Sequence, residues 1–369
     1  MMTSYDVAIV GAGPAGSATA KVIAESGFDV ILIERDNYPG ENNVCAGGVP
    51  KSVVKDFDLL DTVEKEIKYD ILYFPWGEKE IRRENVTVYR YVFDRRLAEK
   101  AVESGTKLLT RTTIVDVEVT KDDIKVITKD NKKISAKLVI FADGPNTLAY
   151  RKFGIGFKPD ADKLFVAVVC EVRWENNPFD SFELYFDPSI VPWGYGWVFP
   201  KKNTVNIGLG CLYSKLNDNM MKSLKFFLKE YRTVGDRFGD KEIVWLRAAT
   251  IPAAPAEKIY SERMLVVGDA AGMVDPISGG GIAHAIAGGV IAGKVCIEAL
   301  ESNDFSFKML SKYQKLWTKS LDYYSIKVRY LLSTIFLFLF KFDKRAYAKL
   351  VDFGYGKESK LKKILKILK

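Results

Sequence analysis

The sequence predicts an α/β protein in which a parallel-sheet domain is interrupted by a β-rich insertion and followed by a C-terminal helical tail. The parallel sheet is indicated by three short apolar segments, residues 6–10, 138–141 and 264–267. They lie far apart in the chain, and each leads into a glycine-rich or acidic loop. Alternating apolar residues between them indicate the β-rich insertion. At 369 residues the chain is long enough to build two domains without disulfides.

The first of these strands leads into a glycine motif that predicts a βαβ unit. Residues 6–10 are followed by Gly11, Gly13 and Gly16, and then by a small-residue helix that Gly27 ends. In such a motif the first glycine permits a tight turn, the second leaves room for a pyrophosphate, and the third lets helix and strand pack closely. The helix N-terminus adds free N–H groups and a positive dipole end. The pattern therefore predicts a Rossmann-like dinucleotide site.

The next strand, residues 29–33, ends in Glu34. A carboxylate at this place accepts hydrogen bonds from a ribose and repels a 2′-phosphate, which favours an adenosine without that phosphate. The loops at Asp143 and Gly268 follow two later strands, and the carboxyl ends of parallel strands share one edge of a sheet. We therefore expect several distant segments to hold one ligand.

The predicted nucleotide-binding domain is discontinuous because other material separates its strands. Alternating patterns at residues 115–128, 164–174, 180–186 and 204–212 indicate that this material is β-rich. We expect residues 1–50, 88–155 and 260–304 to form the nucleotide-binding domain, residues 51–87 and 156–259 the β-rich substrate domain, and residues 305–369 a helical, basic tail.

Charge and cysteine content exclude several classes of function. Residues 341–369 hold ten basic and three acidic residues, so they carry nearly all of the net charge of +8. The main body is thus not expected to bind nucleic acid. Four widely spaced cysteines and a single histidine do not make a metal site, and we expect none. No signal-peptide pattern opens the chain, so we expect a cytoplasmic location.

Five patterns together carry a resemblance to a known family. They are the glycine motif at 11–16 with Glu34, Cys-Ala-Gly-Gly at 45–48, Arg-x-x-Phe-Asp-x-x-Leu at 90–97, Gly-Asp-Ala-Ala-Gly-x-x-x-Pro-x-x-Gly-Gly-Gly-Ile at 268–282, and Pro-x-Gly-Tyr-x-Trp-x-Phe-Pro at 192–200. The chain resembles the geranylgeranyl reductase family of flavoproteins, including digeranylgeranylglycerophospholipid reductases, within the group that shares the p-hydroxybenzoate hydroxylase fold. The last seventy residues carry no part of this resemblance.

The resemblance implies FAD as the cofactor of the nucleotide-binding domain. It assigns the pyrophosphate, the adenosine ribose, the ribityl chain and the flavin ring to residues of several separate segments. The implied cofactor-binding residues are Gly11, Gly13, Ala15, Gly16, Glu34, Cys45, Ala46, Gly48, Arg90, Ile114, Asp269, Gly281 and Ile282. For the last pair, N–H donors at a helix start would also stabilise negative charge on a reduced ring.

Cys45 and Tyr195 are the candidate catalytic residues. A lone cysteine is usually a small buried hydrophobe, but Cys45 lies in a glycine loop expected beside the flavin, where it could donate a proton or shape the pocket. Tyr195, Trp197 and Phe199 alternate along one strand, which fits either ordinary β packing or an aromatic wall beside a long apolar substrate. His284 follows the last glycine turn and is expected to be structural.

The resemblance implies a reductase that saturates C=C bonds of a long isoprenoid chain, such as the geranylgeranyl groups of archaeal-type glycerophospholipids. Reduced flavin N5 would supply the hydride and an acid the proton. Two alternatives stay open, an FAD-dependent monooxygenase of the same fold and a prenyl-quinone reductase or flavin electron-transfer protein. A halogenase is disfavoured because residues 194–200 do not reproduce its Trp-x-Trp-x-Ile-Pro signature. The electron donor, NADPH, ferredoxin or another, is left open by the sequence.

The tail has two features suited to a membrane surface. Residues 330–340 are uncharged and strongly apolar but too short to span a bilayer, and residues 360–369 place lysines and apolar residues on opposite helical faces. A core-packing helix followed by a solvated tail would show the same pattern. We favour peripheral contact with the inner face of the cell membrane, because the apolar segment suits the acyl boundary and the lysines suit anionic headgroups.

Overall fold

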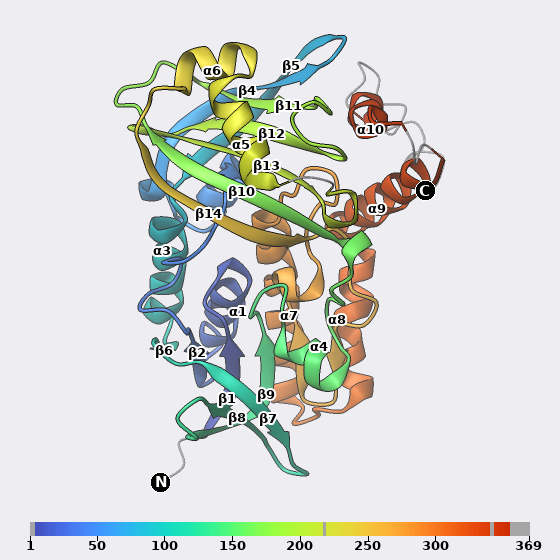
Figure 1. Cartoon of the computed structure of the whole chain (residues 1–369). Coiled ribbons are helices and arrows are strands. Elements are labelled where there is room, and N and C mark those ends of the chain that lie inside the picture. Colours follow the sequence, from blue (N-terminus) through green and yellow to red (C-terminus); the bar gives the residue numbers. More distant parts are fainter. Residues whose placement is uncertain (1–3, 217–218, 340–342, 355–369) are drawn as a thin grey trace.

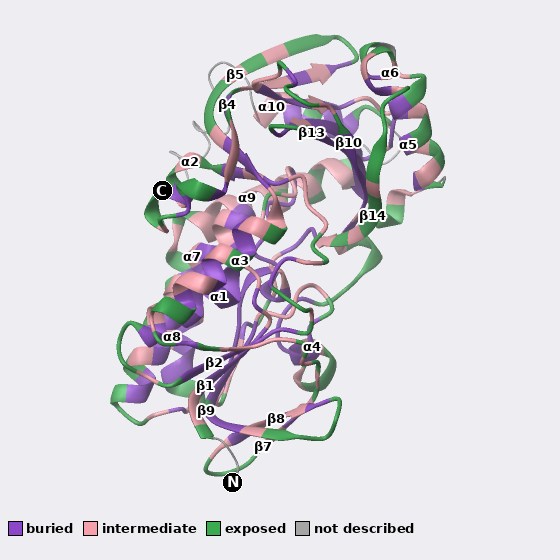
Figure 2. Cartoon of the chain, turned by 90° about the vertical axis from the view of Figure 1, so that its left-hand side faces the viewer, coloured by how far each residue is buried: buried purple, intermediate pink, exposed green. Residues whose placement is uncertain are grey.

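The protein is built on two mixed sheets that lie at opposite ends of an elongated molecule (Figure 1). The computed structural model describes residues 4–216, 219–339 and 343–354, and within them each sheet has eight strands. Buried residues concentrate in these strands and in the helices packed on them (Figure 2). The predicted α/β architecture with a β-rich insertion and a helical C-terminal region is confirmed.

The first sheet brings together strands from both ends of the chain. Its order is β15 (Tyr260–Ser261), β16 (Met264–Val266), β9 (Lys133–Phe141), β1 (Ser4–Val10), β2 (Val30–Ile33) and β6 (Lys107–Leu109). All pairs between β16 and β6 are parallel, and β15 is antiparallel to β16. β2 is buried throughout, and β1 and β9 are apolar and buried over the four residues at their carboxyl ends, as expected for parallel strands covered on both sides.

Helices α3 (Arg90–Glu103), α1 (Pro14–Ala24), α7 (Ile282–Glu301) and α8 (Phe307–Lys319) lie side by side across the first domain (Figure 1). Glycines bring α7 close to α1. A Cβ atom at Gly289 would lie 2.6 Å from the carbonyl oxygen of Ala15, and one at Gly293 would lie 2.8 Å from Val22 Cγ1. By length and composition alone α7 could cross a membrane, but its glycine face is a packing surface of the core. The short helix α4 (Leu148–Phe153) follows the β9 end.

The second sheet forms the inserted domain. Its order is β14 (Ile243–Pro252), β10 (Leu164–Arg173), β13 (Thr204–Leu212), β12 (Gly194–Pro200), β11 (Ser181–Tyr185), β4 (Val63–Phe74), β5 (Gly77–Val88) and β3 (Gly48–Pro50). Only the β11–β4 pair is parallel among these described strands. Helix α5 (Met220–Lys229) packs its apolar face on β10 and β13, and α6 (Arg232–Phe238) follows it. Helix α2 (Lys51–Asp56) follows β3.

One segment pairs differently from the predicted domain boundaries. Strand β3, which the predicted boundary at residue 50 assigns to the first domain, pairs with β5 in the second sheet. The difference arises because the sequence of so short a strand does not identify its partner. The alternating residues 115–128 form a hairpin of β7 (Ile114–Val119) and β8 (Ile124–Thr128), which joins β9 in the first sheet, within the predicted range 88–155.

The tail is helical over its described part, with α9 (Leu321–Leu339) and α10 (Ala346–Gly354) after α8. Helix α9 projects from the side of the molecule, and α10 returns to pack on the inserted domain (Figure 1). The amphipathic pattern predicted for residues 360–369 lies outside the described residues.

Replacing Gly289 by alanine tests the close packing of α7 on α1. The new Cβ meets backbone oxygen at 2.6 Å, so the helices must separate, and we expect unfolding to become easier by about 1–3 kcal/mol despite the better helix propensity of alanine. Thermal and urea denaturation measure the change. Gly354→Ala in α10, where the new Cβ meets no described atom within 4 Å, is the control and should be neutral or slightly stabilising.

Candidate functional site

The carboxyl ends of four parallel strands meet at one edge of the first sheet. In the strand register Val10 lies beside both Ile33 and Phe141, and Phe141 lies beside Val266. The residues that follow these positions begin the glycine turn, the Glu34 corner and the loops at Asp143 and Gly268. The expectation that distant loops converge on one site is thus met by the register itself.

The glycine turn between β1 and α1 is shaped by two kinds of glycine. Gly11 has φ +103°, and a Cβ atom there would lie 2.3 Å from the carbonyl oxygen of Ala142. A Cβ atom at Gly16 would lie 2.0 Å from the carbonyl oxygen of Gly11. Gly13, by contrast, has no described atom within 4 Å of its Cβ position. Packing therefore explains Gly11 and Gly16, whereas the open space at Gly13 fits a ligand that approaches the backbone.

Glu34 is held in place by backbone amides of the same corner. Its Oε2 accepts a hydrogen bond from the Ala12 N–H at 2.9 Å, and its Oε1 accepts one from the Asp36 N–H at 3.0 Å. The side chain is nearly buried. Each carboxylate oxygen can accept a second bond, so the group can still receive ribose hydroxyls.

Two carboxyl groups in the later strand-end loops are buried, and the protein does not offset the full cost of burying their charge. Asp143 accepts from the Leu148 N–H at 2.7 Å, but its Oδ1 is buried and has no hydrogen-bond partner within the described residues. Burial raises the pKa of Asp143, although its bonds to Thr147 and Leu148 oppose the shift. Burial likewise raises the pKa of Asp269, against the attraction of the Arg90 guanidinium. Such groups fit a site where a ligand supplies the missing donors.

The start of α7 lies beside Asp269. A Cβ atom at Gly281 would come within 3.4 Å of Asp269 Oδ1, and Ile282 is the first residue of the helix. The first N–H groups of a helix have no partner within the helix, so this end offers hydrogen-bond donors and a positive dipole end.

Cys45 contacts the first turn of α3. Its Sγ accepts from the Gly47 N–H at 3.4 Å. Arg90 is fixed by Asp94 through two bonds of 2.7 Å, and its pKa lies above the ordinary value because the charges and hydrogen bonds of Asp94 and Cys45 outweigh the opposing effect of burial. The Cys45 side chain also packs on the apolar cluster that includes Ile282. The half-buried thiol therefore stands between a fixed cation and the start of α7.

The aromatic residues of β12 lie on the sheet face that α5 does not cover. On the α5 side, a Cβ atom at Gly196 would lie 2.8 Å from the Phe227 ring, and Val198 belongs to the same apolar cluster. On the other face, the β12 wall (Tyr195, Trp197 and Phe199) gathers with Val44 and Ala46 of the loop before β3. The wall thus faces the Cys-Ala-Gly-Gly loop. Gly48 packs directly on the stacked rings of Phe182 and Phe199, whose centroids are 3.8 Å apart.

Tyr195 connects the wall to the loop before α7. Its hydroxyl donates a hydrogen bond to the carbonyl oxygen of Ser278, three residues before Gly281. A Cβ atom at Gly279 would lie 3.7 Å from the same hydroxyl. The proposed substrate wall and the proposed flavin-ring contacts therefore belong to one continuous site.

A buried ion pair lies beside the wall on the same sheet face, and sequence reasoning missed it. Lys201 and Glu171, which are 2% and 1% exposed, are paired at 2.8 and 2.9 Å. Asn206 donates to Glu171 at 2.8 Å and accepts from Trp197 Nε1 at 2.9 Å, so the network fixes the indole. A glutamate within the otherwise apolar strand β10 was the sequence signal that could have revealed it.

Two residues singled out from the sequence lie apart from these contacts. Ile114 begins β7 and packs against the core of the first domain, so its backbone contact with the cofactor stays a prediction. His284 bonds through Nδ1 to Asp322 Oδ1 at 2.6 Å, which ties α7 to α9 and fits the expected structural role.

Comparison with known proteins decides the family. Residues 4–304 match the FAD binding domain family. Digeranylgeranylglycerophospholipid reductase of Methanocaldococcus jannaschii is 34% identical over 88% of this chain and 85% of its own length. A reductase of the same name, number 1 of Methanopyrus kandleri, is 32% identical over 85% of this chain and 86% of its own length.

The chain belongs to the digeranylgeranylglycerophospholipid reductase family of FAD-binding proteins. It is a flavin-dependent oxidoreductase, and its cofactor is FAD. The solved structure of a geranylgeranyl bacteriochlorophyll reductase-like protein from Thermoplasma acidophilum superposes with a TM-score of 0.83 at 25% identity, covering 99% of this chain and 100% of that one. A flavin-dependent brominase shares the fold, with a TM-score of 0.74 at 18% identity over 99% of each chain.

The residues of the site fit FAD. The open space at Gly13 suits a pyrophosphate, the Asp143 Oδ1 that has no partner among the described residues suits a ribityl hydroxyl, and the first N–H groups of α7 suit a ring carbonyl. We propose the cofactor roles predicted above for these segments.

Gly13→Val separates ligand binding from packing. Its side chain meets open space, so the apoprotein should keep its melting temperature within a few degrees, while the dissociation constant for FAD rises at least tenfold because the β-branched group occupies the pyrophosphate side. Fluorescence titration of the apoprotein with FAD measures the affinity. Gly16→Ala, whose Cβ meets backbone at 2.0 Å, should instead lower the melting temperature. Unchanged FAD affinity in Gly13→Val would contradict the assignment.

Lys201→Met tests the buried ion pair beside the wall. Removing the ammonium leaves Glu171 buried without its counter-ion, which should cost about 3–5 kcal/mol of unfolding free energy in urea titrations. The double variant Glu171→Gln with Lys201→Met should lose less than the single variant, since no buried charge then remains. Lys133→Met, which breaks the exposed Lys133–Glu118 pair, is the control and should cost less than about 1 kcal/mol.

Proposed function

We propose that this protein reduces C=C bonds of a long isoprenoid chain, namely the geranylgeranyl groups of archaeal-type glycerophospholipids. The observation that carries the proposal is the similarity to digeranylgeranylglycerophospholipid reductases, at 30–34% identity, over both domains of this chain. The β12 wall lies within the matched length and supports the proposal, because a long apolar chain needs an apolar surface along which to lie.

Reduction of an isolated alkene depends more on how the protein positions the substrate than on charged groups that bind it. An isolated alkene has no carbonyl to activate it, so the protein must hold one carbon near the hydride source, keep water away and supply a proton to the other carbon. Reduced FAD, when bound, supplies the hydride. The faces of Tyr195 and Trp197 can stabilise positive charge that develops at the more substituted carbon. Asn206 holds the Trp197 indole in one orientation for this purpose.

Cys45 is the proposed proton donor. Its thiol stands in the loop that faces the β12 wall and packs beside the first residue of α7, so it borders both the proposed ring contacts and the substrate side. Arg90 lies next to it and can stabilise the thiolate that proton transfer would leave. Tyr195 is a less suitable donor, because its hydroxyl proton is engaged with the carbonyl oxygen of Ser278.

An external reductant must load the flavin, and we propose that it docks at the protein surface. NADPH and ferredoxin are both compatible with the sequence, which has one dinucleotide fingerprint. We also propose that the protein works at the cytoplasmic face of the membrane, where a lipid substrate with two long chains resides.

The direct test is an anaerobic incubation of dithionite-reduced protein with unsaturated archaeal lipid, followed by mass spectrometry. The proposal expects a gain of two hydrogens per reduced double bond without oxygen. A monooxygenase would give an oxygen-dependent gain of one oxygen atom. Reoxidation of the flavin with no change in lipid mass would indicate an electron-transfer protein and overturn the proposal.

Cys45→Ala tests the proton donor. Loss of a general acid should slow single-turnover flavin reoxidation by prenyl lipid by about 10²–10⁴-fold, while FAD stays bound. Cys45→Ser should restore part of the rate, and the wild-type rate should fall in D₂O. Cys211→Ala, which removes a buried thiol from the core of the inserted domain, is the control and should react at the wild-type rate. A Cys45→Ala variant as fast as the wild type would leave Cys45 only a role in pocket shape.

A further inference from the structure

Helix α9 exposes an apolar surface that the proposed reaction does not use. Leu331, Ile335, Phe338 and Leu339 are 57%, 42%, 82% and 63% exposed, and their spacing places them on one face of the helix. We call these four residues the α9 stripe. The segment from Tyr330 to Leu339 has no charged residue. A contiguous exposed apolar surface of this kind marks an interaction site.

Basic residues stand at both ends of the α9 stripe. Exposed Lys327 lies one helical turn before Leu331, and exposed Lys344 and Arg345 precede α10. The sequence of residues 355–369 adds six lysines against one glutamate. An apolar stripe bracketed by cations matches the two zones of a lipid surface, acyl chains and anionic headgroups. The charge pattern does not match a second copy of the stripe, because two copies would bring like charges together.

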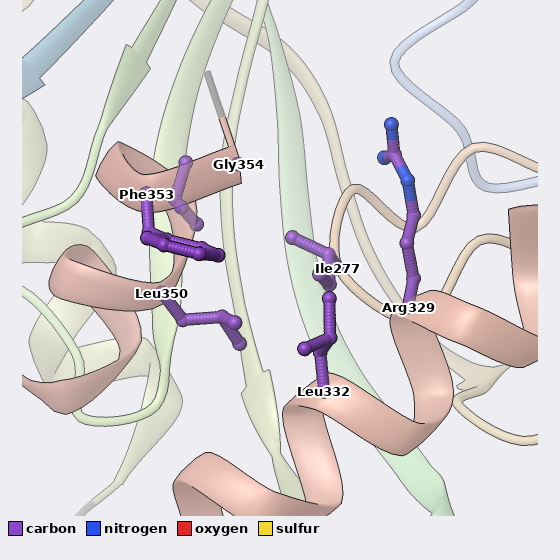
Figure 3. A pocket seen from close by; sticks show the side chains of 7 residues that line it. Ile277, Arg329, Leu332, Leu350, Phe353 and Gly354 are labelled. Carbon is purple, nitrogen blue, oxygen red and sulfur yellow. The ribbon is translucent and has the colours of Figure 1, made fainter. Parts of the chain in front are cut away.

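The buried side of α9 borders a small apolar pocket (Figure 3). Leu332 of α9 and Ile277 stand on one side of it, and Leu350 and Phe353 of α10 on the other (Figure 3). Arg329, at the edge of the pocket, is paired with Asp275. The pocket therefore opens between the two tail helices, directly beneath the stripe-bearing helix.

An apolar cluster continues from this pocket to the β12 wall. Tyr347 of α10 donates to the carbonyl oxygen of Ile277, and Ile277 is next to Ser278, the acceptor for Tyr195. The Phe186 ring lies between them, with centroids 6.2 Å from Tyr347 and 5.3 Å from Tyr195. The tail helices thus touch the end of the wall at which Tyr195 stands.

We propose that the α9 stripe docks on an anionic lipid bilayer and that the side of the protein carrying the α9–α10 pocket is the side from which the lipid chain is loaded. The loading step rests on the proposed function, whereas the docking does not. The stripe is too short to span a bilayer and would lie in the interface, with Lys327, Lys344 and Arg345 at the headgroups.

Flotation with vesicles of phosphatidylglycerol and phosphatidylcholine, free of prenyl lipid, tests the docking. The oxidised full-length protein should float with anionic vesicles, and raising the salt should weaken the association. Ile335→Glu and Phe338→Glu should each reduce the vesicle-bound fraction at least tenfold while FAD content and melting temperature stay unchanged. Lys344→Gln with Arg345→Gln should weaken binding to anionic vesicles only.

Val102→Glu is the matched control, because Val102 is 44% exposed, like Ile335, but lies on α3 at the far side of the first domain (Figure 1). It should float as the wild type does. Wild-type protein that stays with the soluble fraction would overturn the proposal, as would Ile335→Glu and Phe338→Glu variants that bind normally. A wild-type dimer that Ile335→Glu converts to a monomer, with no vesicle binding, would also overturn it and identify the stripe as a subunit interface.

A second readout separates this proposal from the proposed function. Ile335→Glu should lose reduction of prenyl lipid embedded in vesicles but keep reduction of the same lipid dispersed in detergent. Equal rates on vesicles for the variant and the wild type would overturn the loading side. Vesicle binding without reduction of either preparation would leave the docking intact and overturn the reductase assignment alone.

Discussion

The whole structure depends on the absence of side chains where β1 turns into α1. Gly11 and Gly16 let the helix start within contact distance of the β1 and β9 ends, and any Cβ at either position would collide with backbone oxygen. Because the chain can turn this tightly, the Ala12 N–H reaches Glu34 and the free N–H groups of α1 point to the edge where the strand loops meet. Gly13 then leaves the open space that a pyrophosphate requires.

Two buried carboxylates, Glu171 and Asp143, differ in how far the protein supplies their hydrogen bonds, and this contrast points to the ligand. In the inserted domain Glu171 accepts hydrogen bonds from Lys201, Thr204 and Asn206. It therefore stabilises the wall and needs no ligand to supply donors. In the first domain Asp143 keeps a buried oxygen without a partner among the described residues, and burial raises its pKa. A folded protein tolerates such a group where binding returns the lost hydrogen bonds.

A few direct contacts connect the two domains at the site. Tyr195 reaches across to Ser278, and Gly48 lies against the Phe182–Phe199 stack with no room for a side chain. These contacts place the aromatic wall, the cysteine loop and the start of α7 around one volume. The same loop before α7 contacts Tyr347 of the tail through Ile277, so the tail is connected to the site by a short path.

The sequence predicted those features that depend on residues close together in the chain. The glycine motif, the Glu34 corner and the aromatic alternation of β12 depend on neighbours within a few residues, and each was found where expected. The partner of β3 was less accessible, because β3 pairs with β5 across the predicted domain boundary at residue 50. The Tyr195 hydroxyl donates to a backbone carbonyl oxygen. Every residue has such an oxygen, so the sequence could not identify this acceptor. Family resemblance, in turn, supplied roles that periodicity alone could not, above all for Cys45 and Arg90.

The central claim is that the reactive ring of FAD lies between the start of α7 and the β12 wall. A crystal structure of the FAD-bound protein with a saturated geranylgeranyl lipid analogue tests it most directly. The account predicts ring density beside the N–H groups of Gly281 and Ile282, with the prenyl chain along the faces of Tyr195 and Trp197. Ring density elsewhere, or an analogue bound away from β12 while the wall packs only against protein, would contradict the account.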